Sequence, residues 1–365
     1  MIPSDITYTC VDRFLKYVRY DTQSSETSET YPSTLKQLVL GEELVRELLA
    51  MGLKDAEMDE FGYVMATIPA TVDKPGIPVV GFIAHMDTSP EVSGENVKPV
   101  LHENYNGKDI TLPADPSIVI TVDDNPDLSG KIGETIITSD GTTLLGADNK
   151  SGIAEIFDAA QHLITHPEIP HGVIRICITP DEEVGAGTKY FDVKKFGCQY
   201  AYTIDGEHLG SIENETFCAD SMTITFKGVN IHPGFAKGKM VNSVKIAAAF
   251  IDSLPKGRLS PETTANMEGY VHPYVLNGGI EETTVKFLLR SFEVTELRDQ
   301  EALLRELAEK VVADFPKASM TYKVEESYRN MRFVLDEHPA VLEVARLAME
   351  RMGITLTPMG DGFTW

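Results

Sequence analysis

The chain has 365 residues, 42% of them hydrophobic, so it is long enough to form two packed domains. Its 56 acidic residues outnumber its 32 basic residues and give a formal net charge of −24. This balance argues against a nucleic-acid or an anionic-membrane partner, because either would require a basic patch. An acidic surface favours metal ions and substrates with a free amine, although ordinary solubility also accounts for much of the charge.

The first 210 residues alternate predicted helices and strands. Apolar residues recur at helical spacing near 11–18, 44–49 and 150–165, and short β-branched runs predict strands between them. Residues 91–135 are rich in Gly, Pro, Asn and Asp and predict an excursion that carries a hairpin. Alternating strands and helices are typical of an α/β fold with a mainly parallel sheet covered on both faces. The predicted strands are 62–68, 77–84, 135–139, 172–178 and 200–204.

The pattern changes after residue 210. Strand, helix, two strands, helix and strand follow one another, which is the split βαβ order of a small α+β, ferredoxin-like domain. A helix at 339–353 and a strand at 354–358 then resume the α/β style. We therefore expect an α+β lid inserted into an α/β catalytic domain. The predicted parts are 1–210 (catalytic, first part), 211–326 (lid and dimerisation) and 327–365 (catalytic, second part, incomplete).

The cysteines and the first residues of the chain indicate in which cellular compartment the protein is expected. The four cysteines form no C-x-x-C pair, so reduced thiols are the simplest interpretation. The first residues, MIPSDITYTCVDRF, lack a basic region followed by an apolar stretch, and apolar runs such as IPVVGFIA are too short to span a bilayer. We therefore expect a cytoplasmic protein that does not contact a membrane.

Four predicted strands of the α/β part end in side chains that can bind a metal ion. In an open parallel sheet, ligands collect beyond the carboxyl ends of the strands, so these side chains can meet in space. Taken alone, each of these residues could have a purely structural role, as a hydrogen-bonded histidine, a helix cap, a solvated acidic run or a turn. Their common position after strands favours a shared metal site. The residues are His85 and Asp87, Asp148, Glu182 and Glu183, and Asp205.

Six motifs resemble those of the M20 zinc metallopeptidases, and among them the aminotripeptidases, in order and approximate spacing. The resemblance covers nearly the whole chain. It implies two zinc ions per subunit in the α/β domain, a lid that also mediates dimerisation, a homodimer, and a small peptide as substrate. The motifs are AHMDTSP, LLGADNKSGIAEI, TPDEEVGAGTKYFDV, YTIDGE, NIHPGFAKGKMVNS and EESYRNM.

The resemblance assigns roles to the metal-capable residues. Asp148 would bridge two zinc ions, His85 and Asp205 would complete the first site, and Glu183 would serve the second. Asp87 would orient the imidazole of His85. Neighbouring side chains on an extended segment point apart, so Glu182 is left to act as general base on a metal-activated water, while Asp181 is expected to be structural.

The lid would supply the substrate contacts. The resemblance implies that His232 donates to the tetrahedral oxyanion and that Asn242 and Arg290 hold the terminal carboxylate of the peptide. The alternative is that His232 is an ordinary loop residue before Pro233 and Arg290 a charge on a strand surface. On the sequence alone, the substrate-binding and the structural interpretation are about equally supported.

The implied function is a zinc-dependent aminopeptidase that releases the N-terminal residue of tripeptides. An M20-type dipeptidase or N-acyl-amino-acid deacylase remains open, because pocket length is not readable from sequence. The family continues after the last predicted strand with an Arg-Gly-Gly-Thr-Asp-Gly loop and a later histidine, whereas this chain reads MGDGFTW and has no histidine after His338. We therefore expect a truncated or frame-shifted product that holds about one zinc tightly and has low or no activity, or an inactive fragment.

Overall fold

The computed structural model describes residues 8–206 and 209–356. They fall into two compact units, one within residues 8–206 and the other within 209–356. Each unit has its own hydrophobic core. The assignment of 327–365 to the catalytic domain stays a prediction.

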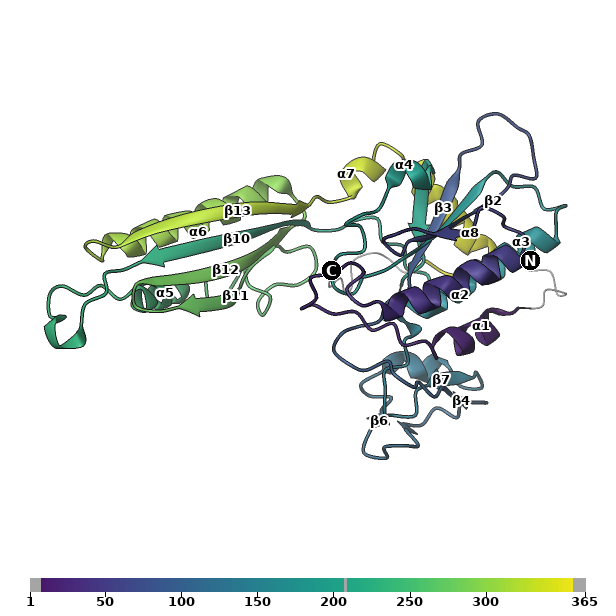
Figure 1. Cartoon of the computed structure of the whole chain (residues 1–365), viewed down its shortest axis with the longest axis horizontal. Coiled ribbons are helices and arrows are strands. Elements are labelled where there is room, and N and C mark those ends of the chain that lie inside the picture. Colours follow the sequence, from purple (N-terminus) through teal and green to yellow (C-terminus); the bar gives the residue numbers. More distant parts are fainter. Residues whose placement is uncertain (1–7, 207–208, 357–365) are drawn as a thin grey trace. The chain divides into compact units, whose positions relative to one another are not determined.

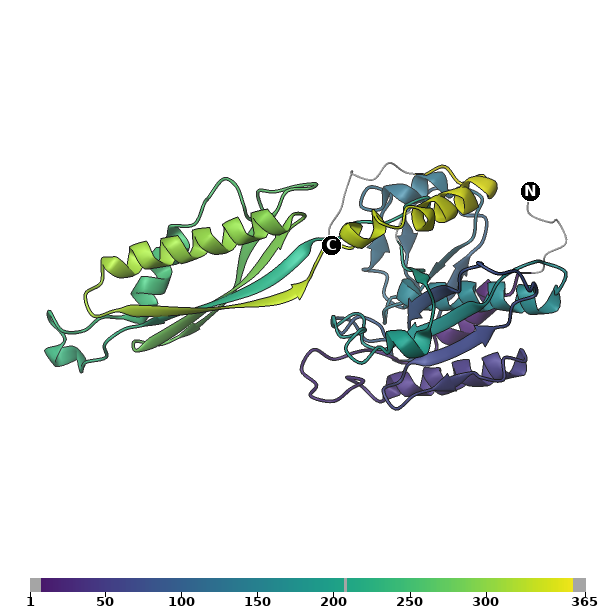
Figure 2. The ribbon, with the colours of Figure 1, turned by 90° about the horizontal axis from the view of Figure 1, so that it is seen from above.

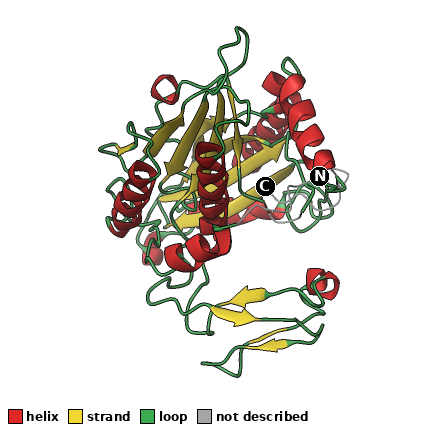
Figure 3. Ribbon diagram, turned by 90° about the vertical axis from the view of Figure 1, so that its right-hand side faces the viewer, coloured by secondary structure: helices red, strands yellow, loops and turns green. Residues whose placement is uncertain are grey.

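The first unit is built on a five-stranded mixed sheet (Figures 1 and 3). Strands β8, β3 and β9 pair in parallel, whereas β1 and β2 add antiparallel pairings at one edge. The α/β fold class is confirmed, and the parallel part of the sheet is the half that ends in the metal-capable residues. In spatial order the strands are β1 (Glu57–Met58), β2 (Val64–Ile68), β8 (Ile174–Thr179), β3 (Val80–His85) and β9 (Tyr200–Thr203).

Both faces of this sheet are covered, because side chains alternate across each strand. Ile176 and Ile178 enter the large core formed with three helices, whereas Cys177 points to a smaller aromatic core with Phe196 of α4 (Val193–Phe196). The second helix is followed by Gly52, whose φ of 99° suits a residue without Cβ. The three helices are α1 (Cys10–Tyr17), α2 (Lys36–Ala50) and α3 (Ala147–Thr165).

The excursion forms two small sheets of its own, at the bottom of Figure 1. Strand β5 (Ile110–Thr111) pairs with β6 (Val119–Ile120), which confirms the predicted hairpin. The strand predicted at 135–139 exists as β7 (Ile136–Thr138), but it pairs with β4 (Val100–His102) outside the main sheet. β-Branched residues favour a strand without specifying its partner. A 3-10 helix, η1 (Pro126–Gly130), completes this region.

The second unit confirms the predicted split βαβ order. Its four strands form an antiparallel sheet in the order β11-β12-β10-β13, and α5 and α6 pack together on one face (Figure 2). The alternating residues Met222, Ile224 and Phe226 are buried in its core. The elements are β10 (Cys218–Lys227), η2 (Pro233–Phe235), α5 (Ser243–Asp252), β11 (Tyr270–Gly278), β12 (Glu282–Ser291), α6 (Val294–Ala313) and β13 (Ser319–Tyr328).

Two helices follow β13, namely α7 (Arg332–Leu335) and α8 (Ala340–Arg351). The strand predicted at 354–358 is wrong for residues 354–356, which lie in no strand, because a strand requires a hydrogen-bonded neighbour. Its last two residues lie outside the described part of the chain. All four cysteines lie in that part and are unpaired. Within it, no helix has the length and apolar character needed to cross a bilayer.

Candidate metal centre

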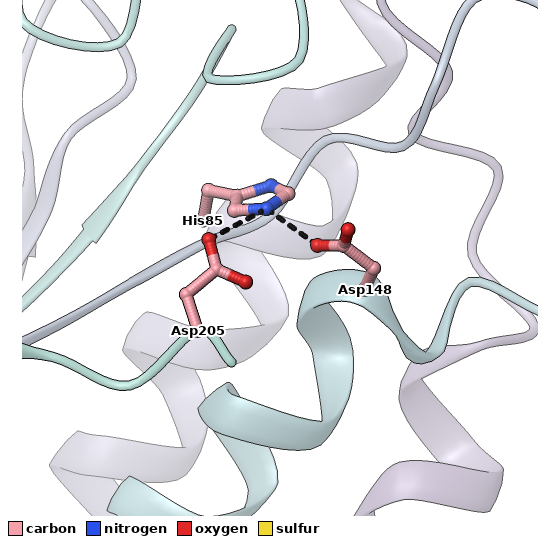
Figure 4. Close-up of side chains that lie close together, drawn as sticks. All are labelled: His85, Asp148 and Asp205. Carbon is pink, nitrogen blue, oxygen red and sulfur yellow. Dashed lines mark hydrogen bonds and ion pairs between the residues drawn. The ribbon is translucent and has the colours of Figure 1, made fainter. Parts of the chain in front are cut away.

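Three side chains from different parts of the first unit converge beyond the strand ends (Figure 4). His85 Nε2 lies 2.8 Å from Asp148 Oδ1 and 3.5 Å from Asp205 Oδ2. One potential ligand atom from each residue lies within 4.8 Å of the others. Imidazole nitrogen and carboxylate oxygen are donors that suit zinc and related divalent ions. Among residues 8–206 and 209–356, this is the single group of three such side chains found together.

The local fold explains why these three residues meet. His85 is the last residue of β3, and Asp205 follows β9, the parallel neighbour of β3. Asp148 lies at the start of α3, directly after a turn at Gly146 with a φ of 78°. Gly152 in the next turn of α3 packs so closely on the chain before Asp205 that a Cβ would overlap the carbonyl oxygen of Ile204. A small residue there therefore lets Asp205 approach Asp148.

Asp87 lies behind His85 and is fully buried. Its Oδ1 lies 3.3 Å from His85 Nδ1, which leaves Nε2 of the same ring facing Asp148 and Asp205. The two carboxylate oxygens of Asp87 also accept hydrogen bonds from the backbone N–H groups of Glu182 (3.0 Å) and Glu183 (3.1 Å). Asp87 thus joins the end of β3 to the acidic segment that follows β8. A carboxylate behind a ligand imidazole fixes its tautomer and orientation.

The charges around His85 act strongly on its protonation. Burial lowers the pKa of His85, but hydrogen bonds with Asp148, Asp205 and Asp87 more than offset this and raise the pKa well above its ordinary value. The same contact with His85 lowers the pKa of Asp148. Without a metal ion, His85 therefore keeps a proton on its imidazole. A metal ion that binds to His85 must displace this proton.

Glu182 and Glu183 lie at the edge of the cluster. Glu182 Oε2 lies 3.8 Å from His85 Nε2, and 54% of its side chain is exposed. Burial is the largest cause that raises the pKa of Glu182, although the charge of His85 opposes it. Burial, followed by the negative charge of Asp148, raises the pKa of Glu183 to about 7. Glu183 can therefore hold or release a proton near neutral pH, beside a second carboxyl group whose pKa is also raised.

Asp181 lies against α2 and not in the cluster. Its carboxylate accepts hydrogen bonds from Ser33 N (2.6 Å), Ser33 Oγ (2.5 Å) and Gln37 Nε2 (2.7 Å). Sequence reasoning did not single out Ser33 or Gln37. A signal was present, because Gln37 is a polar residue in the apolar stripe that continues through Leu40 and Leu44. Such a residue usually has a specific buried partner.

The three predicted lid residues lie in the second unit. His232 and Asn242 cap the starts of η2 and α5, accepting hydrogen bonds from Gly234 N and Val244 N respectively. Arg290 on β12 donates to the carbonyl oxygen of Leu289 and lies over the ring of Tyr328, with 5.8 Å between the guanidinium carbon and the ring centroid. Their substrate-binding roles stay predictions.

Comparison with known proteins identifies the family. The chain is 47% identical over 354 residues to a protein named peptidase T from Geobacillus sp. (strain WCH70), which covers 96% of this chain and 86% of that protein. This chain belongs to the peptidase T family. The predicted resemblance is confirmed, and the chain is a peptidase. The expectation drawn from MGDGFTW concerns residues 359–365, which lie outside the described part of the chain.

Two further comparisons agree with this peptidase T assignment. A family model described as the M20 peptidase dimerisation domain matches residues 214–318. The crystal structure of aminopeptidase PepT from Bacillus cereus ATCC 10987 superposes with a TM-score of 0.72 at 25% identity, covering 97% of this chain and 84% of that one. A Bacillus subtilis M20 peptidase described as dinuclear and metal-binding shares the fold, with a TM-score of 0.58 at 14% identity over 95% of this chain and 80% of that one.

Proposed function

We propose that this peptidase T family member is a zinc-dependent aminopeptidase that releases the N-terminal residue of tripeptides. The observation that carries the proposal is the convergence of His85, Asp148 and Asp205, with Asp87 holding the far side of the imidazole. The names of its relatives support the reaction, since a similar solved structure is an aminopeptidase and a 22% identical chain of the same fold is described as a tripeptidase.

The donor set fits a zinc ion. Zn–N and Zn–O distances near 2.1 Å in a tetrahedral site imply ligand atoms about 3.4 Å apart. His85 Nε2 and Asp205 Oδ2 are already 3.5 Å apart, and Asp148 Oδ1 lies closer on the other side. His85, Asp205 and Asp148 would hold one ion, and Asp148 with Glu183 would contribute to a second. The dinuclear site ascribed to the Bacillus subtilis M20 peptidase supports a pair of ions.

Bound zinc would lower the pKa of a coordinated water and polarise the scissile carbonyl. Glu182 is the carboxyl group best suited to accept the proton from the attacking water. It lies next to the three ligands, its side chain is exposed enough to reach a substrate, and its raised pKa makes it a stronger base than an ordinary glutamate; the proton that it accepts would then pass to the leaving amine. Asp87 would hold both His85 and the backbone of Glu182 in place during this transfer.

The second unit would bind the substrate. We propose that His232 donates to the oxyanion and that Asn242 and Arg290 bind the terminal carboxylate of the peptide, for which a planar guanidinium is well suited. The match of residues 214–318 to a dimerisation domain supports a homodimer. We also propose that the enzyme works in the cytoplasm, where peptides from protein breakdown are available.

Release of the N-terminal residue tests this function. The metal-free chain would be reloaded with zinc and incubated with a free tripeptide, the N-acetylated tripeptide and a dipeptide. We expect zinc-dependent cleavage of the free tripeptide and much slower cleavage of the other two. Preferred hydrolysis of the acetylated peptide would indicate a deacylase, and preferred hydrolysis of the dipeptide a dipeptidase. His85→Ala should abolish cleavage, whereas Asp192→Asn, at the exposed cap of α4, should not.

A further inference from the structure

The segment that carries Glu182 and Glu183 begins at a residue in a conformation that side chains rarely adopt. Asp181 has a φ of 55° and is 1% exposed. Asp and Asn tolerate this left-handed region better than most residues, but at a cost that surrounding contacts must offset. Here they do, because Asp181 N donates to Gln37 Oε1 (3.2 Å) and the Asp181 carbonyl oxygen accepts from Ala186 N (2.9 Å).

The side chain of Asp181 adds three stronger contacts. Both of its oxygens accept hydrogen bonds from Ser33, one from the backbone N–H and the other from the hydroxyl, and the second oxygen also accepts from Gln37. Gln37 is fully buried at the start of α2, so this anchor belongs to the rigid core of the first unit. Hydrogen bonds to a buried carboxylate are among the stronger ones in proteins.

The opposite end of the segment is held as well. Tyr63 Oη donates to the carbonyl oxygen of Gly187 (2.9 Å), and Tyr31 Oη donates to that of Ala186 (3.3 Å). Between these ends, Asp87 accepts from the backbone of Glu182 and Glu183. The two functional carboxyl groups therefore project from a segment whose backbone is fixed at three places.

We propose that Asp181 is a positioning residue, and that its anchor on Ser33 and Gln37 sets the direction in which Glu182 and Glu183 leave the backbone. This inference rests on the proposed function, because it assumes that Glu182 transfers a proton and that Glu183 contributes to a metal site. A small rotation at Asp181 moves both carboxyl groups together. Misplacement of a reacting group by 1 Å can cost about 100-fold in rate.

Asp181→Asn is the sharpest test. Asparagine keeps the size of the side chain and the tolerance for positive φ, but it puts an NH₂ donor where an oxygen now accepts from Ser33 or Gln37. Gln37→Met removes the amide at nearly constant volume. Ser33→Ala removes the hydroxyl, whereas Ser33→Thr keeps it and should rescue function. Asp192→Asn is the matched control, since its carboxylate also accepts two backbone hydrogen bonds but lies at α4.

Two measurements separate positioning from folding. For Asp181→Asn and Gln37→Met we expect kcat for a tripeptide to fall about 10- to 100-fold, with KM changed less than about threefold. Zinc affinity of the metal-free chain, measured against a competing chelator, should fall about tenfold, and the absorption spectrum of the cobalt-loaded chain should change. The double variant should lose no more than Asp181→Asn alone, because Asp181→Asn already disturbs the hydrogen bond that Gln37→Met removes.

The outcomes distinguish the two claims. If Asp181→Asn keeps kcat and zinc affinity within twofold of the wild type, the positioning role is wrong while the proposed function stands. If the wild type binds zinc without cleaving peptides, the proposed function fails, and zinc affinity and the cobalt spectrum still decide whether Asp181 orients Glu183. If the wild type binds no zinc, both claims are overturned. Loss of function in Ser33→Thr equal to that in Ser33→Ala would also contradict the role assigned to the hydroxyl.

Discussion

Glu183 should give the metal-free chain a characteristic pH dependence of stability. Burial and then the charge of Asp148 raise its pKa from an ordinary value of 4.5 to about 7. Between these values the folded chain keeps a proton on Glu183 that the unfolded chain has released. The free energy of unfolding must therefore fall as the pH rises through this window, since stability falls wherever the folded state binds more protons. At about 1.4 kcal/mol per pKa unit, the shift would be worth about 3 kcal/mol for a fully buried group, and because Glu183 is only partly buried, solvent screening reduces the expected loss to about 1–2 kcal/mol.

His85 contributes in the same direction over a higher window. Its pKa is raised in the folded chain despite burial, so its contribution is complete below its ordinary pKa of 6.5 and is lost as the pH rises through the higher folded value. Zinc should reverse the trend, because the ion replaces these protons and binds more tightly as they leave. The stabilisation by zinc should thus grow between pH 6 and pH 8.

Urea unfolding with EDTA measures this effect. We would compare the wild type with Glu183→Gln at pH 5 and pH 8, following the transition of the first unit by circular dichroism. The free energy of unfolding of the wild type relative to Glu183→Gln should drop by about 1–2 kcal/mol between the two pH values. Asp192→Asn serves as the control and should show no such change. A wild-type-to-variant difference that is the same at both pH values would refute the raised pKa and the burial of Glu183 beside Asp148.

Three substitutions test other parts of the site. Glu182→Gln should lower turnover by orders of magnitude and leave the metal content unchanged, because it removes a base and not a ligand; near-normal turnover would contradict its role. Arg290→Ala should raise KM for tripeptides with a free carboxylate far more than for amidated ones, and equal losses would show that it does not bind the terminus. Gly152→Ala should force Ile204 and Asp205 away from α3, which costs about 1–3 kcal/mol of stability and weakens zinc binding. An unchanged melting temperature and zinc affinity would rule out this close approach.

The convergence of the site was predictable because it follows from strand direction. His85 and Asp205 end neighbouring parallel strands, and any fold that pairs these strands brings the two side chains to one edge. The order of elements in the second unit was equally readable, because Met222, Ile224 and Phe226 alternate as a half-buried strand must. The strands themselves were predicted from periodicity, which is local information, and their shared direction from the alternation of strands with helices.

The remaining features depend on pairings between distant residues. Ile136 and Ile137 favour a strand, yet nothing in them specifies β4 as the partner. The hydrogen bonds from the backbone of Glu182 and Glu183 to Asp87 span about a hundred residues. Their donors are main-chain N–H groups, which nearly every residue type has, so the sequence does not indicate them. Gln37 is recognisable in the sequence as a polar residue within an apolar stripe, but this pattern does not indicate that its partner is Asp181.

The central claim is that three converging ligands make this chain a zinc-dependent peptidase. Titration of the metal-free chain with zinc, with bound metal and release of the N-terminal residue from a tripeptide measured on the same sample, tests it most directly. The account predicts that activity rises with bound zinc and that His85→Ala, Asp148→Ala and Asp205→Ala each lose both together. Peptide cleavage by a chain that holds no metal, or zinc binding that survives all three substitutions, would contradict it.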